Sequence, residues 1–127
     1  MSQYLVDSDI IIDFLKGEEK AVKFLESLEE IIVSIVTVAE VYQGLRNKEE
    51  LKFVKNFFKT TKVLLIDEKI SQLALKLMER YLLSSHLLIL DAIIAATAIR
   101  HNLTLITGNL KHFKMIKGLN ASYALEV

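Results

Sequence analysis

Short runs of apolar residues alternate with longer segments of helical periodicity, and this alternation constrains the fold of the chain most strongly. The runs IIVSI (31–35) and LTLIT (103–107) are apolar and rich in β-branched residues, without the regular polar alternation of a half-exposed strand. Such strands are typical of a parallel sheet that helices cover on both faces. The pattern therefore predicts an α/β protein, a three-layer α/β/α sandwich with a mostly parallel sheet.

The same pattern gives approximate bounds for each element. We expect strands over residues 3–7, 31–35, 63–66, 103–107 and 122–127. We expect helices over residues 8–16, 19–29, 37–46, 49–59, 67–83 and 90–101. No linker, repeat or low-complexity tract divides the chain, so we expect residues 1–127 to form one domain.

Composition excludes several classes of protein. Cysteine is absent, which rules out disulfides, zinc–thiolate sites and thiol catalysis. The formal net charge is zero, which argues against a general polyanion binder and leaves room for a local basic rim. The longest apolar stretch, residues 82–99, contains Asp91, and no signal peptide precedes the first strand. We therefore expect a cytoplasmic protein without a membrane partner.

Polar side chains follow two of the predicted strands directly. Asp7 ends the first strand and is followed by Ser8 and Asp9, while Thr107 and Asn109 come at and after the end of LTLIT. In parallel sheets covered on both faces, ligands bind beyond the carboxyl ends of the strands. These side chains are therefore candidates for one shared site.

Two further acids fall at related places in the pattern. Glu40 is expected in the first turn of the helix after the second strand, and Asp91 at the start of the helix before LTLIT. Three or four carboxylates in one pocket repel each other and require a cation. An all-oxygen ligand set selects Mg²⁺ or Mn²⁺, and such a site suits metal-assisted phosphodiester hydrolysis.

Each of these acids also has a purely structural interpretation. Asp7 can be a simple N-cap of the first helix. Glu40 forms a capping box with Thr37 in T-V-A-E, which explains Glu40 as well as a ligand role does. Asp91 can cap its own helix, but Ser84–Ser85 offers caps nearby, and an Asp in an apolar stretch needs a partner if it is buried. For Asp91 we favour a site role.

The remaining candidates have weaker signals. Lys111 and Lys114 belong to a solvated basic face or, as the minority interpretation, hold phosphate groups of a substrate. Phe57 and Phe58 are better explained as core or interface than as a platform for base stacking. His112, like the other two histidines, lacks the spacing of a metal ligand and receives no metal role.

The ordered set of motifs resembles a known family. The segments are YLVDSDIIIDFLKG (4–17), SIVTVAEVYQGL (34–45), LLILDAIIAATAIRHN (87–102) and LTLITGNLKHF (103–113). Together they resemble the PIN-domain ribonucleases, and most of all the VapC toxins of prokaryotic toxin–antitoxin pairs. Each motif alone is weak, but their order and spacing over nearly the whole chain are specific.

The resemblance implies a PIN-like α/β/α sandwich and roles for particular residues. Its acidic metal ligands would be Asp7, Glu40 and Asp91. Ser8 and Thr107 would support the site with small hydroxyls, and Asp9 would stand beside them. Asn109 falls where many relatives carry a fourth acid, so this metal-binding position holds a weaker, uncharged ligand.

The resemblance also implies an activity and partners. The chain would be an endoribonuclease dependent on Mg²⁺ or Mn²⁺ that leaves a 5′-phosphate and a 3′-hydroxyl. It would form a homodimer and be inhibited by a VapB-type antitoxin whose tail lies across the site. The apolar faces at residues 22–28 and 51–58 are candidates for such contacts, because a groove that binds an amphipathic helix is a common mode of recognition.

The sequence leaves two alternative functions open. In a HAD-type phosphatase, Asp7 would be a covalent nucleophile and Asp9 a general acid. That family needs a further acidic pair after the strand ending in Thr107, where this chain offers just Glu126. The more serious alternative is a catalytically impaired PIN-like binding module, which the neutral Asn109 favours.

Overall fold

The computed structural model describes residues 3–123, and strands and helices alternate along them as the sequence predicts. The strands are β1 (Tyr4–Val6), β2 (Ile32–Ser34), β3 (Lys62–Leu64), β4 (Thr104–Ile106) and β5 (Ala121–Ser122). The helices are α1 (Ser8–Leu15), α2 (Glu19–Glu26), α3 (Ile35–Gln43), α4 (Lys48–Lys59), α5 (Glu68–Ser85) and α6 (Ile89–Arg100). A short 3₁₀ helix, η1 (Leu110–His112), follows β4.

The five strands form one parallel sheet in the order β3-β2-β1-β4-β5. The chain builds outward from β1 through β2 to β3 and then crosses back to place β4 on the other side of β1. The strand order therefore reverses between β1 and β4. A crevice beyond the carboxyl ends of two such strands is where open α/β sheets bind their ligands.

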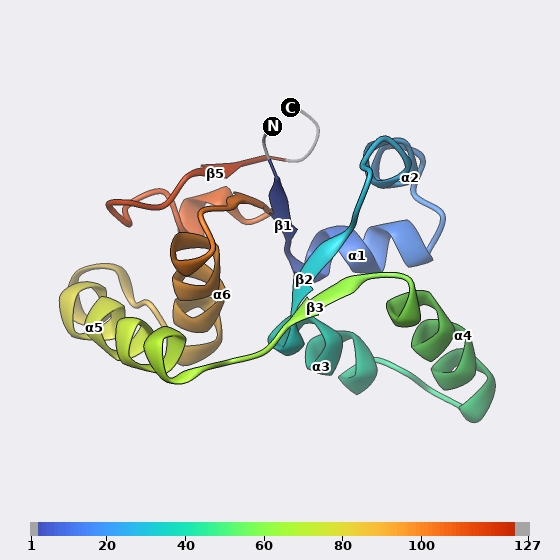
Figure 1. The fold of residues 1–127 in the computed structure, drawn as a ribbon, viewed down its shortest axis with the longest axis horizontal. Helices are drawn as coiled ribbons and strands as arrows, with labels where there is room; N and C mark the ends of the chain where they lie inside the picture. Colours follow the sequence, from blue (N-terminus) through green and yellow to red (C-terminus); the bar gives the residue numbers. More distant parts are fainter. Residues whose placement is uncertain (1–2, 124–127) are drawn as a thin grey trace.

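Successive residues of the central strands pack on opposite faces of the sheet, which explains the continuous apolar runs. Leu5 and Leu105, paired across β1 and β4, belong to a core cluster with α5 and α6. Val6 and Ile106, the next pair, belong to a second cluster with α1, α2 and α4. Figure 1 shows α5 and α6 on one side of the strands and α1–α4 on the other. The predicted sandwich is therefore confirmed.

The predicted start of α3 is wrong by two residues. Ser34 is the N-cap, with extended backbone angles, and its Oγ accepts a hydrogen bond from Val36 N at 3.0 Å. The serine at the end of β2 thus begins the helix before Thr37 can cap it. The capping box between Thr37 and Glu40 does not exist, and Glu40 lies in the second turn of α3 instead of the first. Capping therefore no longer explains Glu40, which strengthens the case that Glu40 has a role in a functional site.

Neither Asp91 nor the two serines before it caps the helix that contains Asp91. Ser84 and Ser85 lie inside α5, which ends when His86 adopts the left-handed conformation at φ 57°. Helix α6 then begins with Leu88 as N-cap, without a capping side chain, and Asp91 is its third residue. Asp91 is therefore not explained as a cap.

The edges of the sheet differ slightly from prediction. Strand β3 ends at Leu64, and the next two residues, Leu65 and Ile66, are exposed instead of paired. At the other edge, β5 consists of Ala121 and Ser122, while residues 124–127 of the predicted last strand lie outside the described part of the chain. None of the helices in residues 3–123 is both long enough and apolar enough to cross a membrane.

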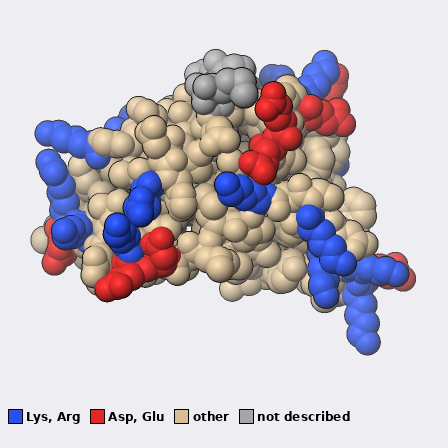
Figure 2. Space-filling model, viewed as in Figure 1, with Lys and Arg blue, Asp and Glu red and all other residues tan. Residues whose placement is uncertain are grey.

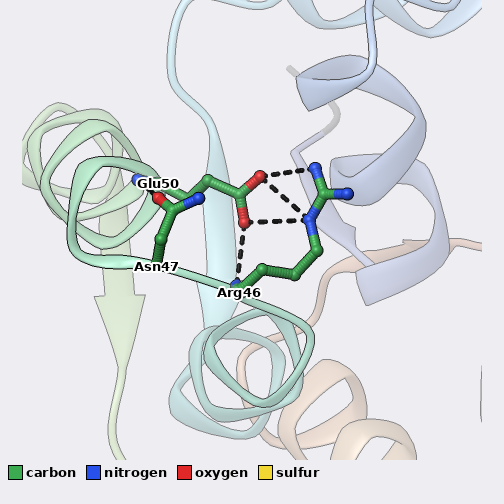
Figure 3. A network of polar contacts seen from close by, with 3 residues as sticks. All are labelled: Arg46, Asn47 and Glu50. Carbon is green, nitrogen blue, oxygen red and sulfur yellow. Dashed lines mark hydrogen bonds and ion pairs between the residues drawn. The ribbon is translucent and has the colours of Figure 1, made fainter.

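Helix α4 begins with a polar network that the sequence analysis did not identify (Figure 3). Asn47 is the N-cap, and its Oδ1 accepts a hydrogen bond from Glu50 N at 2.8 Å. The Glu50 carboxylate accepts from Arg46 N at 2.8 Å and from the Arg46 guanidinium at 2.7 Å. The network joins the end of the α3–α4 loop to the first turn of α4.

Candidate active site at the carboxyl edge of the sheet

Asp7 lies where β1 ends and α1 begins, and its side chain is fixed on both oxygens. Oδ1 accepts a hydrogen bond from Ser8 N at 2.8 Å, so Asp7 is indeed the N-cap of α1. Oδ2 accepts a hydrogen bond from the Thr107 hydroxyl at 2.8 Å, across the switch between β1 and β4. The residue is 7% exposed. A cap alone does not require this second, buried contact.

The environment of Asp7 works against its negative charge. Burial raises the pKa of Asp7, while the hydrogen bonds from Thr107 and Ser8 lower it, and the negative charge of Asp91 raises it further. The net direction is upward. A buried carboxylate that is held by hydrogen-bond donors and repelled by a second carboxylate is an environment that a bound cation would stabilise.

Asp9 faces the turn that follows β4. Its Oδ2 accepts a hydrogen bond from Gly108 N at 2.9 Å, and the Asn109 amide nitrogen lies 3.4 Å from the same oxygen. Burial, followed by the charge of Asp7, raises the pKa of Asp9 to about 6. A Cβ atom on residue 108 would collide with this oxygen, so glycine allows the turn to approach α1. Gly108 was not among the predicted site residues, although a glycine directly after a strand is a signal for close backbone approach.

Glu40 and Asp91 approach the same edge from α3 and α6. Burial raises the pKa of Glu40, the Ser8 side chain lowers it, and the charges of Asp7 and Asp91 raise it. Burial likewise raises the pKa of Asp91, which His112 opposes. The predicted acids are therefore close enough to interact electrostatically, and the fold brings them together from three separate segments.

His112 lies beside Asp91, although the sequence analysis gave it no role at the site. Its Nδ1 is 3.5 Å from Asp91 Oδ2. Its ring also acts on Asp7, whose pKa it lowers. No spacing rule finds this contact, because it joins a 3₁₀ turn that follows β4 in the chain to a helix that precedes β4.

One buried hydroxyl near this set lacks a partner. Thr37 is fully buried, and its Oγ1 makes no hydrogen bond within residues 3–123. Thr37 and Glu40 are three residues apart on α3 and so lie on the same side of the helix. An orphaned buried polar atom costs stability unless a water molecule or another ligand satisfies it.

The other predicted site residues are placed as follows. The Asn109 backbone N–H donates to Thr107 Oγ1 at 3.0 Å, so Asn109 belongs to the same network as Asp7. Lys111 and Lys114 are exposed on the segment that follows, where they could belong to a solvated face or contact phosphate groups of a substrate.

On the face shown in Figure 2, basic side chains are scattered among acidic ones, with no broad basic surface. Phe58 is buried and packs against Phe57, as predicted.

The residues of this edge fit a divalent ion in their chemistry. The donors of Asp7, Asp9, Glu40 and Asp91 are all carboxylate oxygens. Burial raises the pKa of each, and the charges of neighbouring acids raise those of Asp7, Asp9 and Glu40 further. Hard divalent cations prefer such oxygens. Within residues 3–123, however, no three His, Asp or Glu side chains surround a common point at which an ion would sit. Binding therefore requires side chains to turn inward.

A separate apolar groove lies away from these acids, between α1, α3 and α4. Its volume is about 660 Å³. Its apolar lining consists of Ile12, Leu15, Val41, Leu45, Phe53 and Val54. Arg46 and Glu50 of the network in Figure 3 stand at its rim. The predicted face at residues 51–58 therefore borders a groove, whereas in the face at residues 22–28 Leu25 is buried in the core.

The fold and the acidic edge together define an α/β protein with a candidate site for a divalent cation. The family model for the PIN domain matches residues 4–118. The chain therefore belongs to the PIN-domain family. The resemblance seen in the sequence is confirmed, and the HAD-type alternative falls.

Relatives and solved structures agree with this membership. The chain is 37% identical over 125 residues to Ribonuclease VapC19 of Mycobacterium tuberculosis, covering 94% of this chain and 98% of the relative. It is 33% identical over 120 residues to Ribonuclease VapC1 of Methanocaldococcus jannaschii, and this match covers 91% of this chain and 82% of the relative. A toxin–antitoxin complex from Klebsiella pneumoniae contains a similar chain, with a TM-score of 0.83, 30% identity and coverage of 98% and 100%. The structure of VapBC2 from Rickettsia felis bound to a DNA fragment from its promoter also contains a similar chain. Its TM-score is 0.81 and its sequence identity 26%, and the match covers 94% of this chain and 97% of that one.

Proposed function

We propose that this protein is a divalent-metal-dependent endoribonuclease, the VapC-type toxin of a toxin–antitoxin pair, acting in the cytoplasm. The observation that carries the proposal is the buried Asp7–Thr107 contact at the strand switch, with Glu40 and Asp91 within electrostatic reach. Relatives named ribonucleases, at up to 37% identity over nearly the whole chain, support it. One PIN domain accounts for all of the proposed chemistry.

The acidic residues would have different roles, because some of their side chains are held by hydrogen bonds and others can move. Asp7 is the fixed ligand, because Thr107 and Ser8 N hold both of its oxygens. Glu40 and Asp91 are more exposed and can turn toward a cation or a water molecule. When bound, Mg²⁺ or Mn²⁺ would supply charge neutralisation for the phosphate and a lowered pKa for the attacking water.

The test is cleavage of pooled cellular RNA by purified protein with Mg²⁺, Mn²⁺ or EDTA. Asp7→Asn should reduce cleavage more than about a hundredfold, because a metal ligand is lost. Asp67→Asn is the matched control, since Asp67 caps α5 through Ile70 N far along the chain and Asn caps equally well. Cleavage that persists in Asp7→Asn, or in EDTA, would contradict the proposal.

The alternative of a binding module without catalysis is favoured by two observations. Asn109 is neutral, and within the described residues no three His, Asp or Glu side chains are grouped so that they could hold a metal ion. The same preparation separates the two functions. If folded, antitoxin-free protein gives no cuts with either ion and melts at the same temperature with and without Mn²⁺, the binding module is correct. A rise in melting temperature with Mn²⁺ that Asp91→Asn abolishes would favour the metal site.

The proposed partner is a VapB-type antitoxin, because a structural neighbour is a VapBC assembly. The groove between α1, α3 and α4 suits the apolar face of an amphipathic helix. Phe53, 65% exposed at its edge, is the natural anchor for such a helix. Phe53→Glu should prevent copurification with the coexpressed antitoxin while RNA cleavage by the free protein stays unchanged. Copurification at the wild-type level would move the antitoxin site elsewhere.

The proposed homodimer would use a different surface. Large exposed apolar side chains occur on α5 and the segments on either side of it: Leu65, Ile66, Leu75, Leu83, Leu88, Ile89 and Leu90. Exposed apolar residues in such number mark interaction surfaces. Sedimentation of the purified protein should give a dimer that Leu88→Lys weakens. A wild-type monomer at micromolar concentration would contradict this part of the proposal.

A further inference from the structure

The contact between His112 and Asp91 joins two elements that are distant in the chain. His112 ends η1, and Asp91 lies in the first turn of α6. Nδ1 of the histidine is 3.5 Å from Oδ2 of the aspartate, with the two side chains 51% and 38% exposed. An ion pair between groups this exposed contributes at most about 1 kcal/mol to stability. Stability alone therefore gives little reason for the contact.

The backbone around His112 is fixed, so the ring is held near the acids. His112 N donates to the Asn109 carbonyl oxygen at 2.9 Å, and Phe113 N donates to that of Leu110 at 3.0 Å. Phe113 is 1% exposed and anchors the turn in the core formed with α5 and α6. The buried phenylalanine thus sets the position of the exposed histidine beside it.

Asn109 is engaged elsewhere in the site. Its side-chain nitrogen lies 3.4 Å from Asp9 Oδ2, and its backbone N–H donates to Thr107. With its amide nitrogen toward Asp9, Asn109 contributes on the Asp9 side of the edge. On the Asp91 side, the imidazole nitrogen Nδ1 of His112 lies 3.5 Å from Asp91 Oδ2.

We propose that His112 is a specificity-determining metal ligand, which supplies an imidazole nitrogen next to Asp91 and makes the site prefer Mn²⁺ to Mg²⁺. The inference rests on the proposed function, because it requires that the acids bind a divalent ion. Imidazole favours transition-metal ions, whereas Mg²⁺ strongly prefers oxygen ligands. Neighbouring ligands of an octahedral ion lie about 3 Å apart, so a separation of 3.5 Å needs little side-chain movement.

The first test is calorimetric titration of metal-stripped, full-length protein with MnCl₂ and MgCl₂. We expect the wild type to bind Mn²⁺ more tightly than Mg²⁺, and His112→Ala to reduce the ratio of the two affinities about tenfold, mainly by weakening Mn²⁺. His112→Asp, which replaces the imidazole nitrogen by a carboxylate oxygen, should shift the preference toward Mg²⁺. His101→Asn, a change at an exposed histidine that ends α6, is the matched control and should leave both affinities unchanged.

The second test detects the ligand atom itself. Pulsed electron paramagnetic resonance of bound Mn²⁺ should show nitrogen-14 modulation from a coordinated imidazole in the wild type and in His101→Asn. The modulation should be absent in His112→Ala. This readout does not depend on RNA cleavage, and a histidine that merely positions Asp91 would not produce it.

The outcomes separate this inference from the proposed function. If His112→Ala weakens Mn²⁺ and Mg²⁺ equally, or changes neither, and no nitrogen modulation is seen, His112 is not a ligand while the acidic metal site stands. If the wild type binds neither ion, both the inference and the proposed metal dependence are overturned. Melting curves in EDTA would establish that each variant is folded before titration.

Discussion

The Thr107 hydroxyl donates a hydrogen bond to Asp7 Oδ2 at 2.8 Å, linking two residues that are 100 positions apart in the chain. The same hydroxyl oxygen accepts a hydrogen bond from Asn109 N at 3.0 Å. Thr107 is fully buried and Asp7 nearly so. Since the parallel pairing of β1 and β4 sets this contact, the sheet itself positions the central acid.

The first prediction removes that hydroxyl. Thr107→Val keeps the shape of the side chain but leaves Asp7 Oδ2 and Asn109 N without their partner, so it should destabilise the protein by about 1–3 kcal/mol. It should also reduce RNA cleavage, because the pKa of Asp7 rises when the donor is lost. Urea unfolding and cleavage assays measure the two effects.

Two variants test whether the effect belongs to this particular contact. Thr107→Ser retains the donor and should keep most of the activity. Thr97→Val removes another buried hydroxyl, one that donates to Ile93 O within α6, and should leave cleavage unchanged. Equal cleavage by Thr107→Val and the wild type would show that the contact is structural alone.

The second prediction concerns the pH dependence of the metal-free protein. The pKa of Asp9 is about 6 in the folded state, well above the 3.8 of an ordinary aspartate side chain. The unfolded chain therefore loses this proton first as pH rises, and the folded state loses stability between about pH 4 and pH 6. The raised pKa values of Asp7, Glu40 and Asp91 act in the same direction.

Asp9→Asn should remove the Asp9 part of this loss. In EDTA, the variant should gain about 1–2 kcal/mol over the wild type at pH 7, after allowance for partial exposure, and nothing near pH 3.5. Glu79→Gln, at an exposed position of α5 away from this edge, is the control. If Asp9→Asn were no more stable than the wild type at pH 7, the burial and repulsion of the Asp9 charge would not limit stability.

The third prediction uses the orphaned hydroxyl of Thr37. Thr37→Val replaces a buried, unpartnered polar group by a methyl group of similar shape, so the free energy of unfolding should rise by about 1 kcal/mol. Differential scanning calorimetry measures the change. A loss of stability would mean that an ordered water binds the hydroxyl in solution.

Sequence reasoning could predict the fold and the acids because both follow from local patterns. The apolar runs identified the buried strands, and the carboxyl ends of β1 and β4 located Asp7 and Thr107. The start of α3 was missed because Ser34 and Thr37 are both good N-cap residues. Ser34 is the N-cap because β2 ends there and α3 follows directly. The contact of His112 with Asp91 was missed because it depends on where Phe113 anchors a short turn.

The central claim is that Asp7, Glu40 and Asp91 bind a divalent ion. The most direct measurement is anomalous diffraction at the manganese edge from crystals grown at pH 7 and soaked in MnCl₂. We predict a peak in contact with the carboxylates of Asp7, Glu40 and Asp91, and its absence in Asp7→Asn crystals treated in the same way. No peak at this edge in the wild type, or one that persists in Asp7→Asn, would contradict the claim.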